Sequence, residues 1–165
     1  MDAEDQGAGG TEGTAHLRAV PWFAACTAEQ LTEVARIAEH LRVQAGEVIL
    51  REGRLGRELF VILEGTATVT RSGRVVNVLS TGNYFGELAA IEAQPRTATV
   101  TATTDLDVLI IGPRELETMM EIPGFRSALL SGMSRRIREA DDKLAAYAER
   151  YPDFDPLHGG QSPAS

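Results

Sequence analysis

Between Val43 and Gly86 the sequence is divided by glycines into short runs rich in β-branched residues. These glycines are Gly46, Gly53, Gly56, Gly65, Gly73, Gly82 and Gly86. The runs between and after them predict the strands Val48–Arg51, Leu59–Leu63, Thr66–Arg71, Val75–Leu79, Thr97–Ala102 and Asp107–Ile111. Short strands with glycine at the turns are typical of an antiparallel barrel, sandwich or jelly roll. The dipeptide Ser72-Gly73 in addition predicts a hairpin.

Helical periodicity lies on both sides of this β-rich region. Thr27–Leu41 has apolar positions on one face, and Thr27 with Gln30 predicts a capping box. Arg114–Met120 predicts a short helix, and residues 125–151 predict one long helix with a continuous apolar stripe. We therefore predict an α+β fold that is mainly β: an antiparallel β-roll or jelly roll, with N-terminal helices and a long C-terminal helix.

The two ends of the chain are polar and rich in glycine, serine or proline. We expect residues 1–15 to be a disordered leader and residues 152–165 a disordered tail, with one domain at 16–151. The acidic leader is unlike a signal peptide, and no apolar run approaches the ~20 residues of a membrane span. We expect a cytoplasmic protein without a membrane partner, and Met1 favours a complete, stand-alone chain.

Composition limits the function classes. The net charge of −8 and the pI near 4.9 argue against a nucleic-acid-binding surface, which needs clustered positive charge. Cys26 is the one cysteine, so an internal disulfide is excluded; it is either a packed small hydrophobe or a reactive or metal-bound thiol. Lys143 is the single lysine, and the excess of arginine and alanine is associated with a GC-rich, bacterial genome.

The sequence gives no indication of a metal centre. The histidines are His16, His40 and His158, which are far apart, whereas a metal site needs clustered ligands. We therefore expect neither a metal nor another cofactor, and no enzyme of the cupin type.

The segment Phe85–Val100 (FGELAAIEAQPRTATV) concentrates the chemistry of the chain. Gly86 opens a predicted short helix, Glu87–Ile91, whose first amides have no internal acceptor and lie beside small residues. Arg96 follows, with a fork of donors suited to phosphate. Glu87 would repel a phosphate, so it either accepts hydrogen bonds from hydroxyls such as those of a ribose or only complements the helix dipole. The combination indicates a small nucleotide with a single phosphate.

The segment Phe85–Val100 resembles the phosphate-binding cassette of cyclic-nucleotide-binding domains, such as those of protein kinase A regulatory subunits and the catabolite activator protein. Val43–Val69 is similar to the first half of that family's β-roll, and the likeness covers roughly residues 20–151. The resemblance implies that Glu87 accepts from the ribose 2′-hydroxyl and that Arg96 pairs with the cyclic phosphate. The other implied ligand-binding residues are Gly86, Leu88, Ala89, Thr97 and Ala98, with the amides of Gly86, Ala89 and Ala98 on the phosphate.

The resemblance also implies contacts to the sugar and base. Val69 and Val76 are the candidate pocket residues on the roll. The C-terminal helix would close over the base as a lid, with Leu144 and Tyr147 as candidates; the alternative is that they belong to a stripe that packs on the roll. A hydroxyl at Thr97 occurs in receptors of either nucleotide, and we favour cyclic AMP over cyclic GMP.

The implied function is a stand-alone receptor module that binds cyclic AMP and signals to an unknown protein partner through its C-terminal helix. One alternative is a degenerate fold that acts as an interaction module without a ligand. Another is a truncated transcription regulator, because such a regulator needs a helix-turn-helix and only residues 152–165 follow the long helix. The basic run Ser134–Arg138 is a solvated helix face, a partner-docking surface or a distant nucleotide contact.

Overall fold

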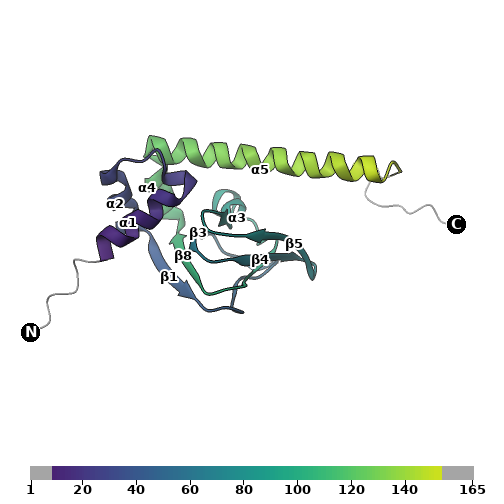
Figure 1. The fold of residues 1–165 in the computed structure, drawn as a ribbon, viewed down its shortest axis with the longest axis horizontal. Helices are drawn as coiled ribbons and strands as arrows, with labels where there is room; N and C mark the ends of the chain where they lie inside the picture. Colours follow the sequence, from purple (N-terminus) through teal and green to yellow (C-terminus); the bar gives the residue numbers. More distant parts are fainter. Residues whose placement is uncertain (1–8, 154–165) are drawn as a thin grey trace, which may run out of the picture. The chain divides into compact units, whose positions relative to one another are not determined.

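The computed structural model of the chain describes residues 9–153 (Figure 1). The chain divides into two compact units after Ala128. The first unit contains all the strands described below and the shorter helices. The second unit lies within helix α5 (Pro123–Arg150) and the residues just after it. The predicted leader at 1–8 and the predicted tail at 154–165 lie outside the described residues.

Within residues 9–153 the strands form two four-stranded sheets in which every pairing is antiparallel. The first sheet has the order β1 (Glu39–Val43), β8 (Leu106–Ile111), β3 (Leu59–Glu64) and β6 (Tyr84–Phe85). The second has the order β2 (Val48–Leu50), β7 (Thr99–Ala102), β4 (Ala67–Arg71) and β5 (Arg74–Leu79). Neighbours in each sheet are mostly distant in sequence, as in a roll, and the predicted fold class is confirmed.

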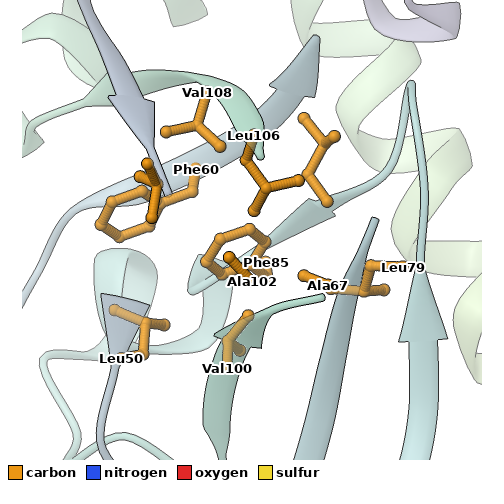
Figure 2. Close-up of a cluster of buried hydrophobic side chains, with 11 residues drawn as sticks. Leu50, Phe60, Ala67, Leu79, Phe85, Val100, Ala102, Leu106 and Val108 are labelled. Atoms are coloured by element: carbon orange, nitrogen blue, oxygen red, sulfur yellow. The ribbon is translucent and has the colours of Figure 1, made fainter. Parts of the chain in front are cut away.

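The hydrophobic core lies between the two sheets (Figure 2). The first sheet contributes Val43, Phe60, Ile62, Phe85, Leu106 and Val108, and the second contributes Leu50, Ala67, Leu79, Val100 and Ala102. The rings of Phe60 and Phe85 are nearly parallel, with centroids 5.0 Å apart. Alternate residues of a strand point to opposite faces, so each long strand supplies every second residue to this core. Phe85 thereby fixes the start of the segment Phe85–Val100 in the core.

The hairpin between β4 and β5 confirms the prediction from Ser72-Gly73. Both residues have positive φ, 50° and 75°, as a two-residue turn of this kind requires. The ladder is interrupted beyond the turn: Val69 pairs with Asn77, and the next pair along is Thr70 with Val75. The residue between Asn77 and Val75, Val76, is therefore left out of the pairing as a bulge.

The capping box at the start of α2 (Ala28–Ile37) is confirmed. The amide of Thr27 donates to Gln30 Oε1 at 2.8 Å, and the amide of Gln30 donates to Thr27 Oγ1 at 3.2 Å. The predicted continuation of this helix to Leu41 is wrong, because Ala38 is extended and the chain enters β1. Strand β1 pairs with β8, beginning with Glu39 opposite Ile110. The hydrogen bonds of this pairing outweigh the helix preference indicated by the spacing of Leu41.

The prediction of disorder is wrong for residues 9–15, which belong to helix α1 (Gly9–Ala19). This helix packs against α2, and its Leu17 side chain is buried. Most of a short helix's stability comes from tertiary packing rather than from composition, so the glycines of this segment did not prevent a helix.

Short elements complete the first unit. They are η1 (Pro21–Phe23), α3 (Glu87–Glu92), α4 (Pro113–Met120) and the first turn of α5. Phe125 on that turn is fully buried against Trp22 and Phe23, with ring centroids 5.7 Å and 5.9 Å away. The predicted short helix inside the cassette is confirmed as α3.

The strand bounds otherwise follow the prediction to within one residue, with three exceptions. Strands β1 and β6 were not predicted, and β7 begins at Thr99 instead of Thr97. Thr97 and Ala98 precede the ladder because its first pair joins Thr70 to Thr99.

Candidate functional site

Gly86 lies where the chain leaves β6 and enters α3, and no other residue fits there without strain. Its φ is +84°, a conformation that favours glycine. A Cβ at this position would lie 2.7 Å from the carbonyl oxygen of Glu58 and 2.9 Å from Nη1 of Arg96. The backbone of Gly86 is therefore in direct contact with the arginine of the same cassette.

Arg96 is a buried charged residue, with 6% of its surface exposed. Its Nη1 donates to the carbonyl oxygen of Gly86 at 3.1 Å, and its Nη2 donates to Glu58 Oε2 at 3.2 Å. The guanidinium also lies 6.0 Å from the centroid of the Phe60 ring. A buried charge is stable only when it is paired and hydrogen-bonded, and Glu58 supplies the nearest opposite charge.

The main chain of Arg96 is held by the loop between β2 and β3, residues 51–58. The amide of Gly53 donates to the carbonyl of Arg96 at 2.8 Å, and the amide of Arg96 donates to the carbonyl of Arg54 at 2.9 Å. In the same loop a Cβ on Gly56 would lie 2.8 Å from Nη2 of Arg96. The loop thus fixes the arginine and leaves no room for a larger residue at position 56.

Burial lowers the pKa of the Arg96 guanidinium from its ordinary value, while the nearby charges of Glu58 and Glu87 act in the opposite direction. Arginine remains charged after such a shift because its ordinary pKa is so high. Glu87, at the first position of α3, is half-buried and close enough to act electrostatically on Arg96. The structure therefore brings the carboxylate of Glu87 near the guanidinium of Arg96, as the sequence predicted.

The remaining predicted cassette residues surround this pair in the chain. On α3, Leu88 is 48% exposed whereas Ala89 is buried. Thr97 is exposed, and its carbonyl accepts a hydrogen bond from Nε of Arg71 at 3.0 Å. Ala98 is half-buried.

Val69 and Val76 do not form a pair on the roll. Val69 is half-buried and packs against the core cluster, whereas Val76 is 53% exposed at the bulge of the edge strand β5. The cross-strand partners of Val69 are Asn77 on β5 and Val100 on β7. Val76 is therefore not among the residues that pair with Val69.

Leu144 and Tyr147, the lid candidates, lie on α5 in the second unit. They are 44% and 48% exposed, and the ring of Tyr147 packs against that of Tyr151 with centroids 4.7 Å apart. Their role toward the cassette stays a prediction.

Glu58 is the residue of this site that the sequence did not reveal. It precedes Arg96 by 38 positions and lies in a polar, glycine-containing loop. The glycines of that loop predicted a turn but not its contact with the guanidinium.

Among residues 9–153, no group of three or more histidine, cysteine or acidic side chains is placed to hold a metal ion. In the same residues, none of the helices combines the length and the apolar character needed to span a bilayer.

The chain belongs to the cyclic nucleotide-binding domain family, because residues 40–122, half of its length, match the model of that family. These residues begin within β1 and end just after α4, so they include the cassette and the loop that holds Arg96.

One curated relative and two solved structures are similar to this chain. A cyclic nucleotide-gated potassium channel of Rhizobium etli is 42% identical over 93 residues, which cover 56% of this chain and 26% of the channel. The regulatory domain of Toxoplasma gondii PKA, co-crystallised with cAMP, is similar with a TM-score of 0.65 and 26% identity, covering 75% of this chain and 49% of that one. The Thermus thermophilus catabolite activator protein shares the fold, with a TM-score of 0.71, 24% identity and coverage of 78% and 63%. The chain spans about a quarter of the length of the curated relatives it matches.

Proposed function

We propose that this chain binds a cyclic nucleotide, with Arg96 pairing with the cyclic phosphate and Glu87 accepting a hydrogen bond from the ribose 2′-hydroxyl. The buried guanidinium of Arg96 carries the proposal. Arginine has five N–H donors, and among the described residues this one makes two hydrogen bonds, to Gly86 and Glu58. Donors left without a partner in a buried place are costly, and an anion would satisfy them.

Main-chain amides beside the arginine support the same reading. The amides of Gly86, Glu87, Leu88 and Ala89 stand at the start of α3, where a helix offers no acceptor of its own. Together with the amide of Ala98 they would complete the phosphate shell. Thr97 and the roll residues Val69 and Val76 would lie toward the sugar and base.

We propose cyclic AMP as the preferred ligand and cyclic GMP as the weaker one. The support is the likeness to the Toxoplasma gondii regulatory domain, whose crystals contained cAMP. The exposed Thr97 is compatible with either base. No further cofactor is part of the proposal.

We propose further that the module acts as a cytoplasmic receptor and not as an enzyme, and that it signals to a protein partner. A ligand changes the arrangement of the C-terminal helix only as far as it binds one arrangement more tightly than another. Leu144 and Tyr147 are the proposed lid residues, since exposed apolar side chains gain from contact with a base. The acidic net charge favours a protein partner over nucleic acid.

A side-by-side calorimetric titration with cyclic AMP and cyclic GMP tests the proposal. Wild type is expected to bind both, cyclic AMP more tightly, and Arg96→Ala to lose roughly 2–5 kcal/mol of binding free energy. Arg42→Ala, an exposed arginine on β1, is the matched control and should bind as wild type does. Absence of binding by folded wild type would favour the degenerate module, and equal affinity for Arg96→Ala would overturn the role of Arg96.

A further inference from the structure

The charge of the β-roll is distributed unevenly between its two sheets. Within the described residues 48–50, 67–79 and 99–102, which form the second sheet and its β4–β5 hairpin, no side chain is acidic. The charged residues of these segments are Arg71 and Arg74, which flank the hairpin turn and are exposed. The first sheet, in contrast, carries Glu39, Glu64 and Asp107. A basic region therefore exists on a chain whose net charge is −8.

The loop between β2 and β3 extends this basic region. The amide of Ser72 in the hairpin turn donates to Glu52 Oε2 of the loop at 2.9 Å, which joins the turn to the loop. Glu58, the other acid of the loop, pairs with Arg96. Five exposed arginines thus outnumber two glutamates that already accept hydrogen bonds. These five form the arginine rim, which consists of Arg51, Arg54 and Arg57 in the loop and Arg71 and Arg74 in the hairpin.

Both parts of the arginine rim contact the cassette close to Arg96. Nε of Arg71 donates to the carbonyl of Thr97 at 3.0 Å. The carbonyl of Arg54 accepts a hydrogen bond from the amide of Arg96 at 2.9 Å. Because Arg96 and Thr97 belong to the segment proposed to bind the phosphate, the arginine rim adjoins the phosphate end of the candidate site.

The arginine rim matters for the approach of an anion. A net charge of −8 repels an anionic ligand at long range, but the field at the entrance of a site depends most on the nearest charges. In water, one unit charge about 10 Å from an anion changes the local concentration of that anion about twofold. Such effects extend over ~30 Å at 0.01 M salt and are largely screened beyond ~10 Å at 0.1 M. Several arginines beside the site therefore outweigh more distant acids.

We propose that the arginine rim steers the anionic cyclic nucleotide into the cassette and so sets its association rate, whereas Arg96 holds the bound phosphate. The inference rests on the proposed function, since it concerns the entry of the same ligand. Charges at the rim of a site change the association rate and its salt dependence more than the dissociation rate. Association should therefore slow as salt is added, although the net charge alone would make it faster.

Stopped-flow mixing of the full chain with a fluorescent analogue of cyclic AMP that keeps the cyclic phosphate tests the sign of this salt dependence. Association with wild type is expected to slow as salt rises from about 10 mM to about 300 mM. Binding whose association rate rises with salt, or does not change, would overturn steering and leave the proposed function standing. Absence of binding at every salt concentration would contradict the proposed function itself, and the inference with it.

A triple variant tests whether the arginine rim causes the effect. Arg51, Arg54 and Arg74, each replaced by glutamine, should together slow association about fivefold at low salt, because three nearby charges are lost. The dissociation rate should stay within about twofold of wild type, and the difference in association should vanish at high salt. Arg71 is kept because its side chain also supports the main chain of Thr97.

A second triple variant with the same change in net charge is the matched control. It replaces the exposed Arg18, Arg42 and Arg114 by glutamine. These residues lie on α1, β1 and α4, which Figure 1 shows on the side of the first unit away from the β4–β5 hairpin. The control should associate like wild type. Equal slowing in both triple variants would mean that net charge alone acts, and faster dissociation of the rim variant would mean direct contact with bound ligand; either result would overturn the proposal.

Discussion

Helix α2 contains one arginine–glutamate pair, and Arg96 of the cassette forms another with Glu58 of the loop between β2 and β3. The two pairs differ in their surroundings. Arg36 and Glu33 approach to 2.6 Å on the helix surface, with side chains 69% and 43% exposed. Arg96 and Glu58 are 3.2 Å apart, and the Arg96 side chain is 4% exposed although that of Glu58 is 49% exposed. Water and ions screen the first pair, whereas the second holds a charge out of water. The burial of Arg96, and not the distance between the charged groups, therefore makes the electrostatic energy of the second pair the larger of the two.

The pKa values of the two arginines move in opposite directions. The hydrogen bond to Glu33 raises the pKa of Arg36, and the same bond lowers the pKa of Glu33. Burial lowers the pKa of Arg96 and outweighs both of its neighbouring carboxylates. Arg96 is thus kept charged in a place that disfavours charge. Such perturbed groups are concentrated at functional sites.

The largest expected effect is the loss of cyclic AMP binding when the arginine of the buried pair, but not that of the surface pair, is replaced by methionine. Arg96→Met should lose roughly 2–5 kcal/mol of cyclic AMP binding. Its free energy of unfolding without ligand should change by no more than about 1 kcal/mol, because an apolar side chain of similar length replaces a costly buried charge. Arg36→Met should bind like wild type. Calorimetry and urea unfolding measure the two quantities, and a large loss of stability in Arg96→Met would show that the arginine is mainly structural.

An intermediate effect is expected for Glu58→Ala, which removes the carboxylate but keeps the guanidinium. The protein without ligand should lose about 1 kcal/mol of stability, because a charged hydrogen bond to a partly exposed partner is lost. The phosphate of cyclic AMP would then supply the missing anion, so the ligand should raise the unfolding temperature more than it does in wild type. Thermal unfolding with and without cyclic AMP measures this, with Glu33→Ala as the control. A smaller ligand-induced increase would mean that Glu58 mainly positions Arg96 for binding.

The smallest effect is expected for Glu33→Gln in the surface pair. Since the folded pKa of Glu33 is lowered, its contribution to stability is present at neutral pH and is lost as the pH falls through that pKa, below the ordinary glutamate value of about 4.3. Wild type should therefore have a slightly higher urea midpoint than the variant at neutral pH and low salt, but not at lower pH or at high salt. A difference that persists at high salt would contradict the screening of this pair.

Structural features that depend only on residues close together in the chain were predictable from sequence. The capping box of Thr27 and Gln30 and the turn at Ser72-Gly73 are such features, because each depends on local hydrogen bonds or backbone angles. Strand β1 was not, since its exposed residues gain their order from β8, far along the chain. Its Leu41 matched the helical spacing only by coincidence.

The residues of the candidate site likewise include some that are close together in sequence and others that only the fold brings together. Gly86, Glu87 and Arg96 lie in one continuous segment whose residue types already indicate an anion site. Glu58 reaches Arg96 only through the fold, and a glutamate in a polar loop carries no sequence signal of such a contact. The bulge that leaves Val76 exposed and puts Asn77 opposite Val69 likewise depends on how β4 and β5 pair.

The aromatic contacts of Trp22 with Tyr84 and Phe125 give the protein an optical reporter of its own. Trp22 is the one tryptophan of the chain, it is 3% exposed, and its ring lies 3.9 Å from that of Tyr84. Tyr84 stands two residues before Gly86, where the chain enters α3. The wavelength and intensity of the emission of this single indole therefore report on the polarity around Tyr84, next to the first residue of the cassette, without any attached dye.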